Sequence, residues 1–259
     1  MKKITKMAAL IAAAALCMGS AFADTEKGYE IMKKASDVKQ PAFTHSLVAM
    51  TLTSKDGSKE VRQVEEFGKN KDGLDSIVMV FLSPASVKGT RFLQVQNDGR
   101  ADDKWIYLPS LKSTRRVNSS EGSKSFMGTD ATYDDLTTRD VDADVHDFLL
   151  EEQKNGYDCW KIKETPKDKA SSQYNYRITW VDKKTYYPIY TEMYDKNDKL
   201  VKTLSVEKIE NQSGYDTPMV NVLKNVQTGH STTLEIVKLI VDQPIPDRVF
   251  TQSFLSTGK

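Results

Sequence analysis

The sequence predicts a mainly β fold with antiparallel strands, on three observations. Strand-like runs recur along the whole chain, turn signals such as Asn155-Gly156 separate many of them, and helical periodicity is scarce. Short strands joined by tight turns favour hairpins and meanders over parallel crossovers. Because the chain shows neither a linker nor a repeat, we expect one domain after the leader. The predicted strands are 43–54, 59–68, 75–83, 90–97, 103–109, 113–118, 145–152, 157–165, 173–182, 185–195, 199–210, 218–228 and 231–242.

Two short stretches have helical character. The segment from Asp24 to Ser36 predicts one short helix, capped by Asp24 or Thr25. The segment from about Ser119 to Leu136 predicts another turn or two. Helices this short can cover part of a sheet, but they cannot form a layer of their own.

The N-terminus predicts a secretory signal peptide over residues 1–23. A basic start precedes an apolar run over 7–18, and Ala21-Phe22-Ala23 offers small residues for cleavage after Ala23. The apolar run is short for a membrane span. Lipidation at Cys17 is the alternative, but Leu16 stands where a lipobox has a small residue. We therefore expect export to the periplasm.

Composition limits what the exported chain can be. Residues 24–259 comprise 236 residues with Cys159 as the only cysteine, so an intramolecular disulfide is excluded and a hydrophobic core must provide stability. Its 34 basic and 36 acidic residues give no general case for nucleic acid as a partner. Since no later segment reaches 18 apolar residues, we expect no stable membrane insertion.

Several predicted strands are apolar on both faces. The stretches HSLVAMTL (45–52) and SIVMVFLSP (76–84) place apolar side chains on either side, and in KWIYLP (104–109) the Trp and Tyr alternate with Ile and Leu. By contrast, 174–180 alternates apolar with polar residues and predicts a half-buried strand. Two explanations remain open at this point. The sheet packs against a second layer, or it curves so that its concave face lines an apolar cavity.

No catalytic residue is predicted. His45, His146 and His230 are scattered, and the sequence contains no HExxH, CxxC, GxSxG or glycine-rich phosphate loop. Cys159 beside Trp160 is expected to be a buried thiol. The sequence therefore predicts neither an enzyme nor a cofactor site.

One acidic stretch imitates a calcium-binding loop. Asp140, Asp142 and Asp144 alternate, and Glu151 follows eleven residues after the first. The loop needs glycine at its sixth position, where this chain has Val145, and the flanking segments predict strands where the motif has helices. We expect a solvated strand face here and no metal.

The centre of the chain resembles a known family. KWIYLPSLKSTRRV (104–117) and FMGTDATYDDL (126–136) resemble the outer-membrane lipoprotein-sorting proteins of the LolA-like superfamily, in the branch found with RND/MMPL-type permeases. That branch shows W-x-Y-x-P, then x-R-R, then F-x-G-[ST]-D-x-[ST]-Y-[DE]-D. One departure is Ala131, where a larger apolar residue is expected. The matching residues are Trp105, Tyr107, Pro109, Arg115, Arg116, Phe126, Gly128, Thr129, Asp130, Thr132, Tyr133, Asp134 and Asp135. Further similar segments are 83–93, 155–167, 186–204 and 245–251.

The resemblance implies a fold and a function. The fold is a single strongly curved antiparallel sheet, an unclosed half-barrel, with short helices covering its concave side. The function is that of a periplasmic carrier of lipid or lipidated protein, with an inner-membrane RND/MMPL-type permease as an expected partner, without catalysis or cofactor. The alternatives are a lipid-ester hydrolase and a non-transporting scaffold module of an RND-type transporter.

The predicted site has two parts. An apolar cavity for acyl chains is expected, and a mouth where an arginine-to-acid contact latches segment 119–136 against the sheet. The helix around Tyr29 to Ala35 and the segment from Glu121 to Gly128 are the expected lids. The predicted lining residues are Leu47, Ala49, Val78, Val80, Phe92, Trp105, Tyr107, Tyr176, Ile178 and Trp180. The predicted mouth residues are Arg115 and Arg116, with Asp130, Asp134 or Asp135 as acid partners, and Tyr133.

Overall fold

The computed structural model describes residues 11–259, so the first ten residues of the expected leader lie outside it. Thirteen antiparallel strands follow the order β6-β5-β4-β3-β2-β1-β13-β12-β11-β10-β9-β8-β7 in one sheet. The sheet begins at β6 and ends at β7, and these two strands do not close it into a barrel. The strands are β1 (Phe43–Thr53), β2 (Lys59–Lys71), β3 (Leu74–Ser83), β4 (Arg91–Val95), β5 (Asp103–Leu108), β6 (Ser113–Arg116), β7 (Asp144–Lys154), β8 (Tyr157–Pro166), β9 (Tyr176–Asp182), β10 (Pro188–Tyr194), β11 (Leu200–Gln212), β12 (Tyr215–Asn225) and β13 (Ser231–Val241).

The predicted mainly β fold is confirmed, and each of the thirteen predicted strands is present, with ends that shift by a few residues. Helices are few. The predicted helix over 24–36 is present, but it begins earlier, so that α1 spans Ile11–Ser36. The remaining helices are α2 (Gln252–Thr257) and the 3-10 turns η1 (Ser119–Glu121), η2 (Val141–Ala143), η3 (Lys169–Ser171) and η4 (Asp247–Phe250). In the described part of the chain, no helix combines the length and hydropathy needed to span a bilayer.

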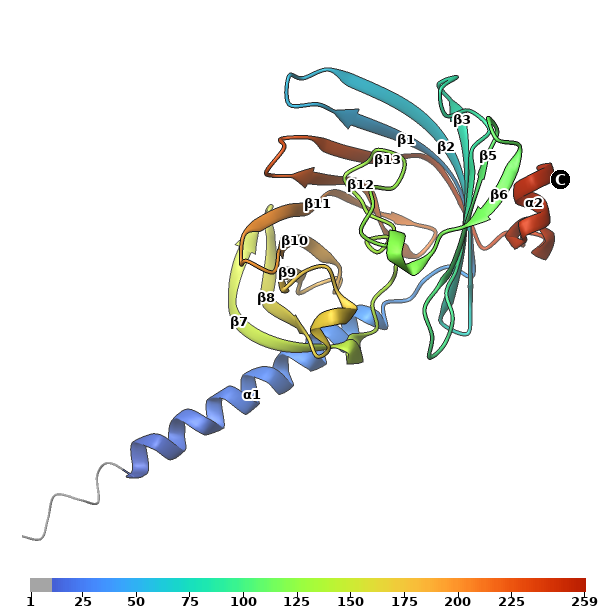
Figure 1. Cartoon of the computed structure of the whole chain (residues 1–259). Coiled ribbons are helices and arrows are strands. Elements are labelled where there is room, and N and C mark those ends of the chain that lie inside the picture. Colours follow the sequence, from blue (N-terminus) through green and yellow to red (C-terminus); the bar gives the residue numbers. More distant parts are fainter. Residues whose placement is uncertain (1–10) are drawn as a thin grey trace, which may run out of the picture. The chain divides into compact units, whose positions relative to one another are not determined.

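The chain forms two compact units. Within the described residues, the first comprises 11–38 and 140–199, and the second comprises 39–139 and 200–259. Figure 1 shows both units with their strands and helices labelled. We describe each unit by itself.

The strands of the second unit pair along most of their length. β1 pairs with β2 over eleven residues and with β13 on its other side, where a register shift between Leu47 and Val48 marks a bulge. Another shift falls between Gln63 and Val64 of β2. Bulges increase local twist and bend the strands that carry them. Figure 1 shows the long strands β1 and β2 bending along their length.

Both faces of this sheet are buried, because its strands alternate between two apolar clusters. One cluster contains Phe81, Phe92 and Ile106, and it is covered by the segment after β6. The other contains Val78 and Leu93, and η4 and α2 cover it with Val249, Phe250 and Leu255 among others. Figure 1 shows the green segment on one side of the sheet and the red α2 on the other. Two-sided strands are thus explained here by a cover on each face.

In the first unit, α1 lies against β7, β8 and β9. Ile31 of α1 packs on Ile162 and Val181, which are both fully buried. The helix approaches the backbone of β7 closely at Gly28. A Cβ atom built on Gly28 would lie 2.2 Å from the carbonyl oxygen of His146. Only glycine permits this approach, because a strand backbone cannot yield without losing its ladder.

Gly28→Ala is expected to destabilise the first unit by about 1–3 kcal/mol, because the added methyl group overlaps the backbone of β7. Without this overlap, alanine in place of glycine would stabilise the helix by about 1 kcal/mol. A loss of stability in Gly28→Ala would therefore point to the overlap with β7. Chemical denaturation followed by circular dichroism measures it. The control is Glu30→Ala on the exposed face of the same helix. A Gly28→Ala variant as stable as the control would contradict the close contact.

Candidate functional site

The segment that covers the first apolar cluster of the second unit, residues 117–137, is here called the strap. It is almost free of helix, with η1 as its only helical turn. Phe126 is 2% exposed and packs edge-on against Phe92, with ring centroids 4.9 Å apart. Tyr133 packs edge-on against Phe126 at 5.6 Å. These two aromatic side chains join the strap to the apolar face of the sheet.

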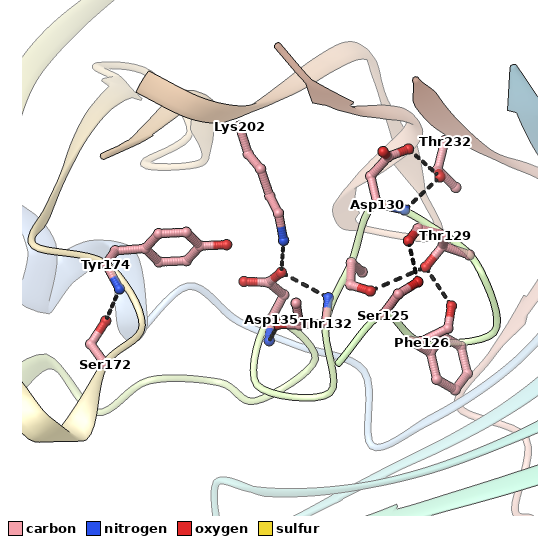
Figure 2. A network of polar contacts seen from close by, with 11 residues as sticks. Ser125, Phe126, Thr129, Asp130, Thr132, Asp135, Ser172, Tyr174, Lys202 and Thr232 are labelled. Carbon is pink, nitrogen blue, oxygen red and sulfur yellow. Dashed lines mark hydrogen bonds and ion pairs between the residues drawn. The ribbon is translucent and has the colours of Figure 1, made fainter. Parts of the chain in front are cut away.

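A tight turn in the strap directs Phe126 toward the sheet. Met127 and Gly128 both have positive φ, at 52° and 77°, where glycine carries no steric cost. The backbone N–H of Phe126 donates to the carbonyl of Ala131 at 2.7 Å, and the Thr129 hydroxyl donates to the Phe126 carbonyl at 2.7 Å. Figure 2 shows this turn and the polar contacts around it. The turn is therefore held by hydrogen bonds within the strap itself.

The first polar anchor of the strap is Asp130, whose side chain is 4% exposed. Its Oδ2 accepts hydrogen bonds from His230 Nδ1 and from the Thr232 hydroxyl, both at 2.7 Å. Its backbone N–H donates to the same Thr232 hydroxyl at 3.0 Å. A buried carboxylate is costly unless it is hydrogen-bonded, and this one is held from several directions.

The second polar anchor is Asp135. Lys202 Nζ of β11 donates to its Oδ2 at 2.7 Å, and both side chains are about nine-tenths buried, with exposures of 10% and 11%. The backbone N–H of Thr132 donates to the same Oδ2 at 2.8 Å. Figure 2 shows Lys202 reaching down from its strand to this carboxylate. Breaking such a pair leaves a poorly solvated charge, so the contact resists opening.

Side chains of the sheet hold the strap at its middle and at its C-terminal end. Arg62 of β2 donates from Nη1 to the carbonyl of Met127 at 2.6 Å. At the C-terminal end, Gln94 Nε2 donates to the carbonyl of Leu136 at 2.9 Å, and Lys104 Nζ donates to the Thr137 hydroxyl at 2.6 Å. Burial lowers the pKa of the Lys104 amine. The strap therefore has an apolar underside and polar attachments along its length.

The predicted arginine latch has different acid partners from those expected. Arg115 Nη1 lies 2.8 Å from Glu121 of the strap, and the charged ends are partly exposed. Arg116 pairs with Asp103 instead. The two arginines point to opposite faces of β6, as neighbours in a strand must. None of the expected partners Asp130, Asp134 and Asp135 pairs with either arginine. Asp130 and Asp135 bond instead to residues far away in the sequence, which the sequence does not place.

The remaining mouth residues lie in the strap. Tyr133 is buried, and burial raises the pKa of its phenol. Asp134 is exposed, and its carboxylate lies where a side chain at Gly122 would be, with Oδ1 2.3 Å from the Cβ position. Gly122 thus permits the strap to fold back on itself.

The ten predicted lining residues do not share one surface. Phe92 belongs to the cluster under the strap, whereas Val78, Val80, Trp105 and Tyr107 belong to the cluster under α2. Leu47 and Ala49 are partly buried on the β1 face opposite Val48 and Met50. In the first unit, α1 covers the face of β9 that carries Val181. The opposite face of β9 carries Tyr176, Ile178 and Trp180. Alternation along each strand separates these groups.

Cys159 is buried as expected, and burial raises the pKa of its thiol to about 11. A thiol with this pKa is almost fully protonated near neutrality, so it is a poor nucleophile.

The histidines and the acidic stretch have local structural contacts. His45 Nε2 lies 2.8 Å from Glu65, and His146 Nε2 lies 2.8 Å from the Val141 carbonyl. Asp140 accepts the Asp142 N–H and caps η2. Asp144 lies 3.5 Å from Arg177.

Sequence reasoning missed the partners that the strap uses in the sheet. They are ordinary polar residues without a motif: Thr232, Lys202, Arg62 and Gln94 lie in strands, and His230 directly precedes β13. A buried polar position within a two-sided strand is the one signal that could have drawn attention to them. Their role depends on contacts with strap residues that lie up to 102 positions away in the sequence.

Comparison with known proteins gives a consistent result. A family model described as "-like: Uncharacterized protein" matches residues 73–257. A candidate outer membrane lipoprotein-sorting protein domain from Vibrio parahaemolyticus is 29% identical with a TM-score of 0.84, covering 90% of this chain and 99% of its own. A DUF1329 family protein from Desulfovibrio piger is also 29% identical, with a TM-score of 0.85 and the same coverage.

A LolA superfamily protein from Nitrosomonas europaea shares the fold, with 19% identity, a TM-score of 0.67 and coverage of 88% of this chain and 98% of its own. The search of curated proteins gave no match.

Asp130→Ala is expected to loosen the strap. The change removes a buried carboxylate that accepts hydrogen bonds from two side chains, and it should cost about 1–3 kcal/mol. Arg115→Ala removes a partly exposed pair and should cost under about 1 kcal/mol. Hydrogen exchange of residues 125–136 should therefore accelerate much more in the first variant. Equal exchange in both variants would show that Asp130 is not the main anchor.

Glu66 should make stability depend on pH. It lies on β2 on the same face as Val64, and burial raises the pKa of its carboxyl to about 7. The pKa of Glu66 is higher in the folded protein than in the unfolded chain. Its contribution to the stability of the folded protein is therefore fully present below the unfolded pKa of 4.5 and is lost as pH rises through about 7.

Glu66→Gln should therefore gain roughly 1–3 kcal/mol over the parent above pH 7, since one pKa unit corresponds to about 1.4 kcal/mol. Urea unfolding across a pH series measures this gain. The control is Glu65→Gln, on the opposite face beside His45, which should show no such gain. Parallel pH profiles for the parent and Glu66→Gln would contradict the assignment.

Proposed function

Because this chain belongs to the LolA-like superfamily and to the family whose model matches residues 73–257, we propose that it is a periplasmic carrier for lipid or for the acyl chains of lipoproteins. The relative from Vibrio parahaemolyticus is described by its place in lipoprotein sorting, which supports this class of cargo. The expected signal peptide, cleaved after Ala23, supports the periplasm as the location.

The observation that carries the proposal is the apolar surface beneath the strap. That surface is not covered by a second sheet or by a helix. It is covered by a loop whose own turn is self-contained and whose attachments to the sheet are polar. Apolar cargo and the underside of the strap would compete for the same surface. A carrier needs such a removable cover, since it must both take up and release its cargo.

The energetics suit acyl chains. Burying one methylene contributes about 0.8 kcal/mol, so a chain of sixteen carbons would contribute on the order of 10 kcal/mol before the costs of binding. Part of that gain would offset the loss of the contacts of Phe126 and Tyr133 with the sheet. The net affinity would then be moderate, which suits transfer from one membrane component to another.

Carriage requires no reacting group, and the site supplies none that is poised for one. The three histidines contact a carboxylate or a carbonyl, and none of them contacts a serine or cysteine. We therefore propose binding without hydrolysis. The donor or acceptor of the cargo would be an inner-membrane permease of the RND/MMPL type, as the family resemblance implies.

The decisive measurement is mass spectrometry of organic extracts from protein purified from its native host. We expect a lipid or an acylated peptide at a stoichiometric amount. Absence of lipid would favour a scaffold module instead. Hydrolysis of phospholipid or acyl ester by rigorously purified protein, abolished by a change such as His45→Ala, would favour an enzyme.

A cross-link tests the role of the strap. Cysteines at Asp130 and Thr232, whose side chains already touch, should form a disulfide that fixes the strap to β13. Oxidised protein should fail to load cargo, and reduction should restore loading, because the apolar face opens only when the strap moves. The control is the single Thr232→Cys variant under the same oxidant. Equal loading in the oxidised and reduced double variant would exclude the strap as the gate.

A further inference from the structure

The first unit carries a face of lysines and aromatic rings that the carrier function leaves unexplained. It is the face of β7 to β10 that α1 does not cover, here called the lysine–aromatic face. Since Val181 and Ile162 point toward α1, their strand neighbours Trp180, Lys161 and Lys163 point away from it. β10 adds Tyr190 and Tyr194, which pair with β9 residues on the same side.

Lysine amines lie directly over the rings of this face. Lys154 Nζ lies 4.5 Å from the ring centroid of Trp180 and 3.8 Å from that of Tyr190. Lys161 Nζ lies 4.6 Å from Trp180, and Lys163 Nζ lies 4.4 Å from Tyr176. Such contacts hold the amines in place while their outer sides remain available to solvent or to an anion.

The acids nearby are already engaged by protein donors. Glu152 accepts a hydrogen bond from Trp180 Nε1 at 2.7 Å and pairs with Lys161 at 3.1 Å. Glu192 accepts from the Tyr194 hydroxyl at 2.7 Å. Over residues 11–259, no carboxylate forms an ion pair with Lys154 or Lys163. The amines of Lys154 and Lys163 can therefore meet an external anion without first leaving a carboxylate partner.

A hollow at one end of this face has the chemistry of an anionic headgroup site. Two lysines, two hydroxyl groups and an amide line it, and the Asn175 amide engages the one carboxylate, Asp198, at 2.6 Å. The lining residues are Lys163, Thr165, Lys169, Asn175, Tyr176 and Asp198. Lys163 and Tyr176 belong to both the hollow and the lysine–aromatic face, so the two features are continuous.

Exposed leucines border the same face. Leu149 and Leu150 are 43% and 42% exposed on β7, the edge strand of the sheet. A register shift between Phe148 and Leu150 marks a bulge there, and a bulge re-aims the side chains around it. Leucines beside partly exposed tyrosines and lysines form a composition that suits a membrane interface, where apolar groups insert and cations meet phosphates.

From this arrangement we propose that the lysine–aromatic face docks on an anionic phospholipid surface. The leucines of the β7 bulge enter the interface, the tyrosines lie at headgroup level, and Lys154 and Lys163 meet phosphate groups. Lys169 and Asn175 receive one headgroup in the hollow. This docking is distinct from binding of cargo beneath the strap, and it brings the carrier to the bilayer without inserting a span.

Co-sedimentation with vesicles tests the proposal. The full exported chain should bind vesicles of phosphatidylcholine with phosphatidylglycerol, and it should bind pure phosphatidylcholine much more weakly. Raised salt should reduce the binding, because surface potential attracts basic residues over about one Debye length. Lack of binding to the anionic vesicles, or equal binding to both kinds, would overturn the proposal.

Two sets of variants separate charge from insertion. Lys163→Glu/Lys169→Glu should weaken binding to anionic vesicles by about tenfold or more, and Leu149→Ser/Leu150→Ser should weaken it at every salt concentration. The matched control is Lys59→Glu/Lys88→Glu, two exposed lysines of the second unit. Binding that is unchanged in both face variants, or equally weakened in the control, would overturn the proposal.

The readouts also keep this proposal separate from carriage. Circular dichroism and thermal unfolding show whether each variant is folded, and mass spectrometry of extracts shows whether it retains cargo. We expect the face variants to retain cargo while losing vesicle binding. Loss of cargo with normal vesicle binding would contradict the carrier function alone.

Discussion

The structure of the second unit depends on one constraint, which is that an antiparallel strand with apolar residues on both faces must be covered twice. Side chains alternate along β3, β4 and β5, so Phe81, Phe92 and Ile106 form one cluster and Val78 and Leu93 form another. Neither cluster is covered by a second sheet. The C-terminal η4–α2 segment covers one, and the strap covers the other. The kind of cover therefore decides what each face can do.

The two covers differ in how they are held. α2 contributes Leu255, which is fully buried, and its attachment is mainly apolar. The strap combines an apolar underside with buried ionic and hydrogen-bonded contacts at Asp130 and Asp135. Apolar contacts are non-directional and can shift at little cost in free energy. Buried charges, by contrast, must keep their partners or be resolvated. Such contacts favour an attachment that is either complete or lost, and this suits the gate proposed above better than a permanent layer.

In the first unit, close packing and surface chemistry are divided between the two faces of strands β7 to β10. Gly28 allows α1 to approach the backbone of β7, which buries Ile162 and Val181. The opposite face then carries the polar and aromatic residues that cannot be buried in this way. The stems of Lys154 and Lys161 and the ring of Tyr190 pack against Trp180, so that it is 3% exposed although it lies on the face that α1 does not cover. The same alternation that stabilises the unit therefore also builds its external surface.

The sequence by itself determined the mainly β class, the number and approximate ends of the strands, the helix over 24–36 and the family, because these depend on local alternation, turn residues and short motifs. It also determined that Arg115 and Arg116 point to opposite faces. Only the tertiary structure decided which face of each strand lies under the strap and which acids hold it. Asp130 meets His230 and Thr232 about a hundred residues away, and Arg115 meets Glu121. Such choices depend on strand register and on contacts between distant segments, and a single sequence read along its length contains no local signal for either.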